Sequence, residues 1–232
     1  MCGIVGSLSV SGYVKEGNIN SSLERMKNRG PNDKGVQIFK QKNNEELILG
    51  HTRLSIIDLS NAGHQPMQSS CKRYTTVFNG EIYNFKELKE ELVLKGHNFA
   101  TNSDTEVLLT AWSEWGKDSL NFLDGMFAFV IYDKKKNSLI CVRDGFGIKP
   151  FFYSVDDNSL FFSSDIHALH ELSQKPKRVC YEKAYEYLIH GRYDNDELTF
   201  IENVKHLRPG YVLEYDCSEK KISEIYKWYI PN

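Results

Sequence analysis

The second residue of the chain is a cysteine, and its position gives it chemistry that an internal cysteine lacks. Removal of Met1 would leave a thiol and a free α-amino group together on Cys2. An α-amino group has an ordinary pKa of about 7.7–8.0, so near neutral pH much of it can accept the thiol proton without a histidine. Cys2 is therefore a candidate nucleophile. On position alone, the alternative is a small residue in a buried strand.

A second candidate is the dipeptide Asn79-Gly80, which lies between two apolar runs. Asn-Gly in this setting is typical of a two-residue hairpin turn. In a catalytic interpretation, the side-chain amide of Asn79 and the backbone N–H of Gly80 both donate to a developing oxyanion, because glycine permits close approach of the backbone. The residues alone leave both interpretations open.

Three charged residues have the chemistry needed to bind an α-amino acid. Arg53 would donate paired hydrogen bonds to its carboxylate, and Glu81 and Asp104 would accept from its ammonium group. Each residue also has a structural interpretation. Arg53 and Glu81 would be charges at the surface and at a strand edge, and Asp104 would stabilise the N-terminus of a helix.

Composition and charge exclude several classes of function. The chain has 232 residues, of which 41% are apolar and 26% charged, which is typical of one or two folded domains. Its 29 basic and 31 acidic residues give a net charge of −2, so we expect neither a nucleic-acid nor a membrane partner. The longest apolar run, 126–132, is too short to cross a bilayer, and no export signal is evident at the N-terminus.

The cysteines and histidines predict no metal site and no disulfide framework. The five cysteines are odd in number and lack CxxC spacing: Cys2, Cys71, Cys141, Cys180 and Cys217. His167 and His170 lie three residues apart, without a partner at metal-ligand spacing, and are interpreted as a solvated pair. We therefore expect a reducing, cytoplasmic setting.

The elements that must position these residues are predicted from apolar periodicity and turn residues. Strands and helices come in clusters, which favours an antiparallel or mixed sheet. The predicted strands cover 2–10, 47–57, 74–78, 210–214 and 224–229. The predicted helices cover 20–29, 84–95, a segment from Ser103, where Glu106 completes a capping box, and 181–190. An antiparallel meander is predicted from 126–132, 138–143, 151–154 and 159–163.

Eight motifs, in order along almost the whole chain, resemble a known family. They are MCGIVG at 1–6, NRGPND at 28–33, HTRLSIIDLS at 51–60, AGHQPM at 62–67, FNGEIYN at 78–84, SDTEVLL at 103–109, LDGMFAFVIYD at 123–133 and RDGFGIKPFFY at 143–153. The family is the class II glutamine amidotransferase domain of the N-terminal-nucleophile hydrolases, in the version found at the front of glutamine-hydrolysing asparagine synthetases.

This resemblance implies an α+β fold of four layers, αββα, with two mostly antiparallel sheets between helix layers. It also implies that Cys2, freed of Met1, attacks the carboxamide of L-glutamine, so that ammonia leaves and water later releases glutamate from a thioester. The remaining roles are implied as follows: Asn79 and Gly80 form the oxyanion hole, Arg53 binds the α-carboxylate, Glu81 and Asp104 bind the α-ammonium, and backbone groups from Leu54 to Ile57 line the pocket.

Some positions depart from the family pattern. Asn28 stands where a histidine is common, Asn32 separates proline from the acid that often follows it, and Asp165 and His167 replace an acid and a lysine in SSDIHALH. The last two would alter a face toward a partner. The segment RDGFGIKPFFY is either such a docking surface or a Gly/Pro turn that joins two strands.

The resemblance also implies a second functional unit. We expect the amidotransferase domain to cover residues 1–215 and residues 216–232 to begin a connector to an ATP-dependent synthetase domain, acting in cis or in trans. The Ser-Gly-Gly-x-Asp-Ser loop of that domain is absent from this sequence, so ATP and Mg²⁺ are expected only there and no cofactor in this chain. The alternative is a catalytically inactive regulatory or docking module of the same fold.

Overall fold

The computed structural model describes residues 1–156, 158–193 and 195–231, and in them two antiparallel sheets form the centre of the molecule. The first sheet has the order β10-β8-β9-β1-β3-β2 and the second the order β12-β11-β7-β6-β5-β4. The first consists of β1 (Gly3–Val10), β2 (Asp33–Lys40), β3 (Glu45–Arg53), β8 (Phe152–Asp156), β9 (Ser159–Ser163) and β10 (Lys205–His206). The second consists of β4 (Met67–Gln68), β5 (Tyr74–Ile82), β6 (Gly125–Asp133), β7 (Ser138–Arg143), β11 (Tyr211–Asp216) and β12 (Lys221–Lys227).

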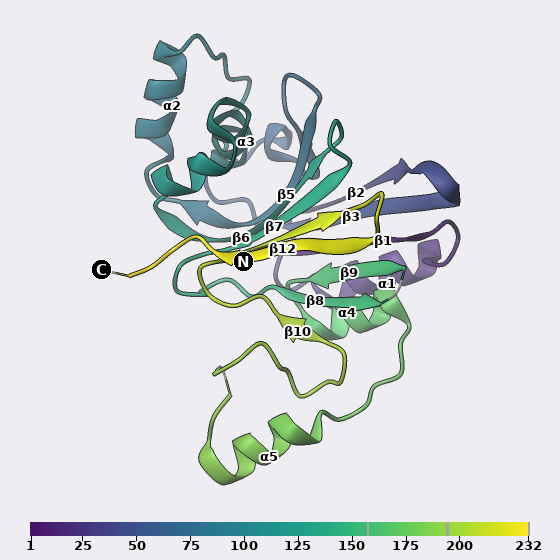
Figure 1. Cartoon of the computed structure of the whole chain (residues 1–232). Helices are drawn as coiled ribbons and strands as arrows, with labels where there is room; N and C mark the ends of the chain where they lie inside the picture. Colours follow the sequence, from purple (N-terminus) through teal and green to yellow (C-terminus); the bar gives the residue numbers. More distant parts are fainter. Residues whose placement is uncertain (157, 194, 232) are drawn as a thin grey trace.

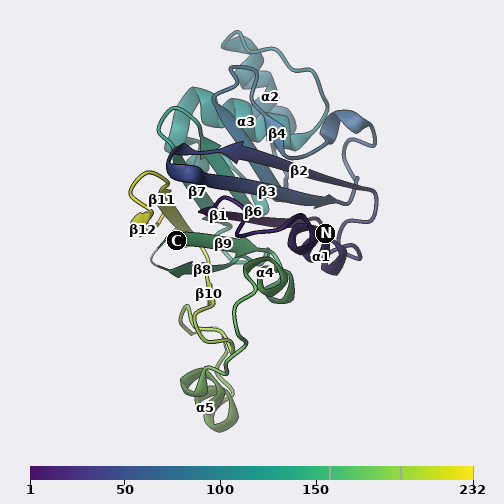
Figure 2. The same ribbon diagram turned by 90° about the vertical axis from the view of Figure 1, so that its right-hand side faces the viewer.

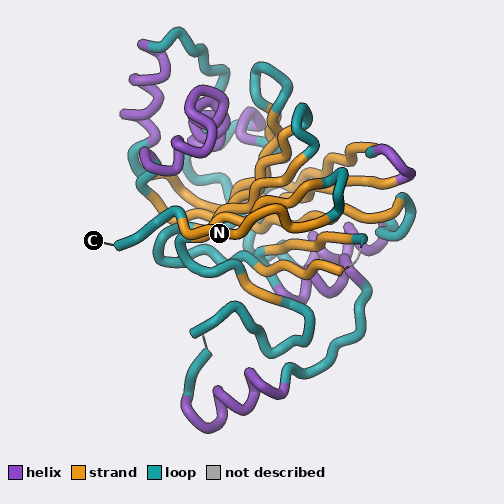
Figure 3. The backbone as a smooth tube through the Cα atoms, in the orientation of Figure 1, coloured by secondary structure: helices purple, strands orange, loops and turns teal. Residues whose placement is uncertain are grey.

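Helices cover the outer face of each sheet, as Figures 1 and 3 show. The covering helices are α1 (Glu16–Arg25), α2 (Phe85–Leu94), α3 (Asp104–Trp115) and α4 (Ile166–Ser173), whereas α5 (Tyr181–His190) lies apart from them. The helices α2 and α3 pack on the second sheet, and α1 and α4 pack on the first. A third apolar core fills the space between the sheets. The predicted αββα layering is confirmed.

Alternation along the strands decides which side chains enter each core. On β5, Val77 points between the sheets, whereas Phe78 points toward α2 and α3. On β3, Leu47 and Leu49 point between the sheets and Ile48 toward α1. Side chains on a strand alternate between its two faces, so residues two apart point to the same face. Residues that follow the inward-pointing ones at this interval, at the ends of the strands, therefore lie at one end of the space between the sheets.

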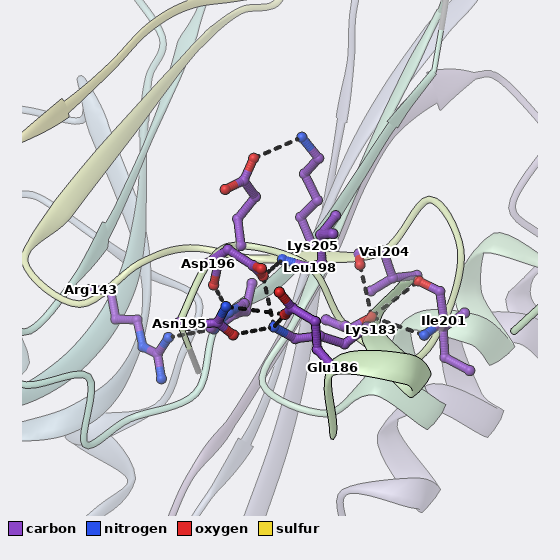
Figure 4. A network of polar contacts seen from close by, with 12 residues as sticks. Arg143, Lys183, Glu186, Asn195, Asp196, Leu198, Ile201, Val204 and Lys205 are labelled. Atoms are coloured by element: carbon purple, nitrogen blue, oxygen red, sulfur yellow. Dashed lines mark hydrogen bonds and ion pairs between the residues drawn. The ribbon is translucent and has the colours of Figure 1, made fainter. Parts of the chain in front are cut away.

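The helix α5 projects away from the four layers, as both views show (Figures 1 and 2). Its Lys183 side chain is fully buried and donates to Asn195 Oδ1 at 2.7 Å and to Asp196 Oδ1 at 2.9 Å. Glu186 Oε2 lies 3.5 Å from the same ammonium. Figure 4 shows these side chains converging on Lys183, so that polar contacts tie α5 to the loop that follows it.

Several predicted elements need correction. The predicted helix 20–29 is α1, which begins and ends four residues earlier; Asn18 closes its first turn by accepting from the N–H of Lys15.

The predicted meander is wrong as a single unit, because residues 144–150 carry the chain from β7 in one sheet to β8 in the other. Ser103 is confirmed as the N-cap of α3. The carboxylate of Glu106, however, accepts from the N–H groups of Ala100 and Thr101 and not from that of Ser103, so the predicted capping box does not form. The strands β2, β4 and β10 and the helix α4 were not predicted.

The predicted strand 47–57 is β3, which ends at Arg53, so that residues 54–57 form a loop and not a strand. The remaining elements agree with the sequence. The helices α2 and α5 and the strands β11 and β12 lie where they were predicted, to within a few residues. Residues 221–227 form β12, which pairs with β11 at the edge of the second sheet. The boundary between residues 215 and 216 stays a prediction. None of the helices in the described ranges is long and apolar enough to cross a membrane.

Candidate active site

The candidate residues from three strands meet at one end of the space between the sheets. Cys2 precedes β1 in register with its inward residues, Arg53 ends β3, and Asn79 lies on β5 two residues after Val77. With Gly80, Glu81 and Asp104 they line a cavity of about 150 Å³. Leu54 and Ile57, predicted as pocket residues, line it as well. All eight predicted site residues are thus brought together.

Cys2 is held at the floor of this cavity by the backbone. Its Sγ accepts from the N–H of Leu54 at 3.4 Å and lies 3.7 Å from the carbonyl oxygen of the same residue. The guanidinium of Arg29 donates to the Cys2 carbonyl oxygen at 3.1 Å. Burial raises the pKa of the Cys2 thiol, so a nearby base is needed to make the thiolate at neutral pH. Burial lowers the pKa of the N-terminal amino group, on Met1.

Asn79 and Gly80 lie inside β5 and not in a turn. The pairing of β5 with β6 runs from Tyr74 to Ile82 without a break, so the hairpin interpretation is wrong. The Asn79 amide is fully buried; its Nδ2 lies 3.4 Å from Ser164 Oγ and its Oδ1 has no hydrogen-bond partner. A Cβ on Gly80 would lie 2.7 Å from Phe127 Cα. A glycine is therefore required by the neighbouring strand.

Arg53 is oriented by the loop that follows β3. Its guanidinium donates to the carbonyl oxygen of Ser60 at 2.7 Å and to that of Asp58. These contacts use some of its five N–H donors and fix the plane of the group. Gly63 packs against the guanidinium so closely that a Cβ there would overlap it. The side chain is 7% exposed and lines the cavity.

Asp104 and Glu81 supply negative charge to the same cavity. Asp104 is the first residue of α3, and its Oδ2 accepts from the N–H of Ile82 at 3.2 Å. Burial raises the pKa of Asp104 to about 6, and the negative charge of Glu81 adds to the rise. Together with the guanidinium of Arg53, these two carboxylates match the charges of a zwitterionic amino acid.

Two residues that the sequence analysis did not single out also belong to this site. Arg29 anchors the backbone of Cys2, and Lys149, 5% exposed, lines the cavity. Both lie within motifs of the sequence, NRGPND and RDGFGIKPFFY, but nothing local distinguishes them from surface charges. Within the described ranges, no group of three or more acidic, histidine or cysteine side chains is arranged to hold a metal ion.

The sequence of the chain is similar to those of known proteins. Residues 1–229 match the family described as "Glutamine amidotransferase domain". "Asparagine synthetase [glutamine-hydrolyzing] 3" of Bacillus subtilis is 33% identical over 219 residues, which cover 93% of this chain and 35% of that protein. "Asparagine synthetase [glutamine-hydrolyzing] 1" of the same organism is 35% identical, over 90% of this chain and 33% of that protein. The chain thus spans about a third of the length of these curated relatives.

A solved structure shares the fold. The glutamine phosphoribosylpyrophosphate amidotransferase of B. subtilis, solved with ADP and GMP, superimposes with a TM-score of 0.70 at 18% sequence identity. The match covers 99% of this chain and 50% of that one. At this identity the likeness concerns the fold alone.

Proposed function

Because the chain belongs to the glutamine amidotransferase domain family, we propose that it hydrolyses L-glutamine to glutamate and ammonia with Cys2 as the nucleophile. The observation that carries the proposal is the convergence of a thiol, an amide donor and three charged groups on one cavity. A catalytically inactive docking module would not need this set, so the alternative of an inactive module is not supported.

The positions of the groups support the first half of the proposed reaction. Removal of Met1 frees the α-amino group of Cys2, which takes the thiol proton. The Sγ atom attacks the carboxamide carbon of glutamine, and the oxyanion accepts hydrogen bonds from Asn79 Nδ2 and the Gly80 N–H. The tetrahedral intermediate then collapses: the C–N bond breaks, the α-ammonium returns its proton to the leaving nitrogen, and ammonia and a thioester result.

The second half repeats these steps with water. The α-amino group takes a proton from water as the hydroxyl oxygen adds to the thioester carbon. The C–S bond then breaks, the thiol regains the proton, and glutamate is released. In both halves, Arg53 would bind the α-carboxylate of the substrate, and Glu81 and Asp104 would bind its α-ammonium group. The backbone from Leu54 to Ile57 would contact the side of the substrate.

The ammonia needs an acceptor, and we propose an ATP-dependent amide-forming synthetase domain, joined to this domain or separate from it. The relatives named as asparagine synthetases are about three times as long as their matched parts. ATP and Mg²⁺ would bind to that domain and take no part in glutamine hydrolysis.

The direct test is glutamate release from L-glutamine, with the intact mass of the same sample and Cys2→Ala beside it. We expect turnover from a chain that begins at Cys2 and none from Cys2→Ala, with the two giving the same thermal unfolding curve. Turnover by Cys2→Ala would exclude the thiol as nucleophile. No turnover by a folded chain with a free N-terminal cysteine would contradict the proposed activity of the isolated domain.

A further inference from the structure

Lys149 places a positive charge in the cavity that neither the fold nor the proposed substrate contacts account for. Its side chain is 5% exposed and lines the cavity beside Cys2. In the part of the chain that the structure describes, its ammonium makes no hydrogen bond or ion pair. The Nζ atom is not among the fully buried polar atoms, so the ammonium is open to the cavity that Cys2 also lines. A charge with no partner among the described residues is thus available to act on the groups in that cavity.

The loop around Lys149 does not depend on this ammonium. The carboxylate of Asp144 accepts from the backbone N–H groups of Phe146, Ile148 and Lys149, at 3.1, 2.9 and 2.9 Å. The guanidinium of Arg143 donates to the carbonyl oxygen of Lys149 at 2.8 Å. Backbone contacts from two preceding side chains thus fix the loop, and the lysine side chain is free to serve the cavity.

The ammonium interacts electrostatically with the Cys2 thiol and with the amino group of Met1, the residue before it. After burial, the positive charges of Lys149 and Arg29 contribute to the lowered pKa of the Met1 amino group, opposed by the Cys2 thiolate. Once Met1 is removed, the amino group of Cys2 would lie one residue further along the same segment. Burial lowers the pKa of Lys149 itself, and the charge of Cys2 opposes that decrease. A positive charge here disfavours the protonated amine and favours the thiolate.

Other charged groups face the same region from each neighbouring element. Arg53, at the end of β3, acts on the thiol in the same sense as Lys149, and Asp104, at the start of α3, acts in the opposite sense. Glu81 on β5 and Asp144 interact with Lys149. Asp165, before α4, interacts with Arg29. Lys149 and Arg29 are the cations that act on the Met1 amino group, and Arg29 is already engaged with the Cys2 carbonyl oxygen.

We propose that Lys149 is a positioning residue that acts electrostatically on Cys2, keeping its free α-amino group neutral and favouring its thiolate. This inference rests on the proposed function, and it adds a residue to the machinery that prepares the nucleophile. Lys149 neither gives nor takes a proton in the reaction. The proton moves from the thiol to the α-amino group and then to the leaving nitrogen, and the lysine charge sets the pH range in which this is possible.

The test is the pH profile of kcat/KM for Lys149→Met, which removes the charge and keeps the length of the side chain. Without the charge the pKa of both the amino group and the thiol rises, so both limbs of the profile move to higher pH. A rise of about half a pKa unit changes the fraction of the active form about threefold on the acidic limb. We therefore expect the loss of kcat/KM at about pH 6.5 to be at least about three times the loss at about pH 8.5. Lys149→Arg should keep the profile of the parent chain, and so should the exposed control Lys177→Met.

Alkylation supplies a measurement that does not need turnover. The rate at which iodoacetamide modifies Cys2, followed by the mass of the N-terminal peptide, should have its midpoint at higher pH in Lys149→Met and in Lys149→Gln than in Lys149→Arg. Equal midpoints in the charged and neutral variants would overturn the proposal. If the parent chain releases no glutamate, the proposed function fails, while the alkylation midpoints still decide the role of Lys149.

Discussion

The ring of His51 on β3 lies with its Nε2 atom 3.0 Å from the carbonyl oxygen of Phe78 on β5. This contact joins the two sheets at the peptide unit that leads directly into Asn79. The His51 side chain is buried, and its Nδ1 atom has no hydrogen-bond partner. Because a carbonyl oxygen only accepts, Nε2 must carry the proton and donate it. A neutral imidazole therefore helps to hold the proposed oxyanion hole in place.

This buried histidine should make the fold sensitive to acid. Burial lowers the pKa of His51 to about 4 from an ordinary value of 6.5. Its contribution to stability is full above 6.5 and is lost as the pH falls from 6.5 toward 4, because the unfolded chain takes up the proton first. The loss amounts to about 3 kcal/mol at most.

Urea unfolding at several pH values measures this effect. The raised pKa of Asp104 has the opposite sign, since its contribution is full below 3.8 and is lost as the pH rises through about 6. The informative quantity is therefore the difference between the parent chain and His51→Gln, whose neutral amide can still donate to Phe78. We expect the difference in unfolding free energy to depend on pH only between 4 and 6.5. A constant difference would contradict the buried, neutral histidine.

Asp104 should make glutamine binding depend on pH. Because its pKa is raised to about 6, the carboxylate that would pair with the substrate ammonium is progressively lost below that pH. Binding to the Cys2→Ala chain, measured by calorimetry, avoids any effect of pH on turnover. We expect the Kd to rise by up to about tenfold for each pH unit below 6, and to be high and flat in Asp104→Asn, which can still accept from Ile82. A flat profile in the parent site would exclude Asp104 as a ligand of the ammonium.

Gly63 offers a way to displace Arg53 without removing it. A methyl group at residue 63 would overlap the Arg53 guanidinium, the movable end of a flexible side chain, so Gly63→Ala should fold and move the guanidinium. We expect KM for glutamine to rise about tenfold or more, since a charged hydrogen bond contributes about 1.5–3 kcal/mol. The matched control is Gly17→Ala in α1, where a Cβ meets nothing within 4 Å. An unchanged KM in Gly63→Ala would argue against Arg53 as the carboxylate ligand.

The chemistry of the site could be predicted from the sequence because it depends on residue types. A thiol at residue 2, an Asn-Gly pair and three charges each suggest a role through their functional groups alone. Position within the fold could not be predicted in the same way. Asn79-Gly80 has the strongest local signal for a turn, yet it continues β5 because the neighbouring strand β6 pairs with every residue up to Ile82. Pairing over nine residues outweighs the preference of two.

The same limit explains the division of the predicted meander and the two residues that were missed. Short strands at close spacing predict a meander, but whether the next strand returns to the same sheet depends on a loop whose form comes from Asp144 and Arg143. Lys149 and Arg29 approach Cys2 from loops 147 and 27 residues away in the sequence. A local sequence pattern does not show which residues so far apart in the chain come into contact in the fold.

The amide of Asn79 should contribute to the transition state more than to substrate binding. Its Nδ2 is held near Ser164 at 3.4 Å, which orients the donor before substrate arrives. We expect Asn79→Ala to lower kcat by about 10²-fold or more with a smaller change in KM, as removal of one oxyanion donor does. Steady-state kinetics on glutamine decide this. A change confined to KM would remove Asn79 from the oxyanion hole.

The buried ammonium of Lys183 should determine whether α5 stays ordered on the molecule. Unlike Lys149, it has acceptors in Asn195 and Asp196, so Lys183→Met would leave polar groups without their donor and release the loop that follows α5. We expect faster amide exchange in α5 and a local cost of about 1–3 kcal/mol, with glutamine hydrolysis retained because the cavity lies on other elements. Lys205→Met, which removes an exposed ion pair with Glu197 in the same region, should cost about 1 kcal/mol or less. Equal exchange rates in the two variants would show that apolar packing, and not the Lys183 ammonium, holds α5.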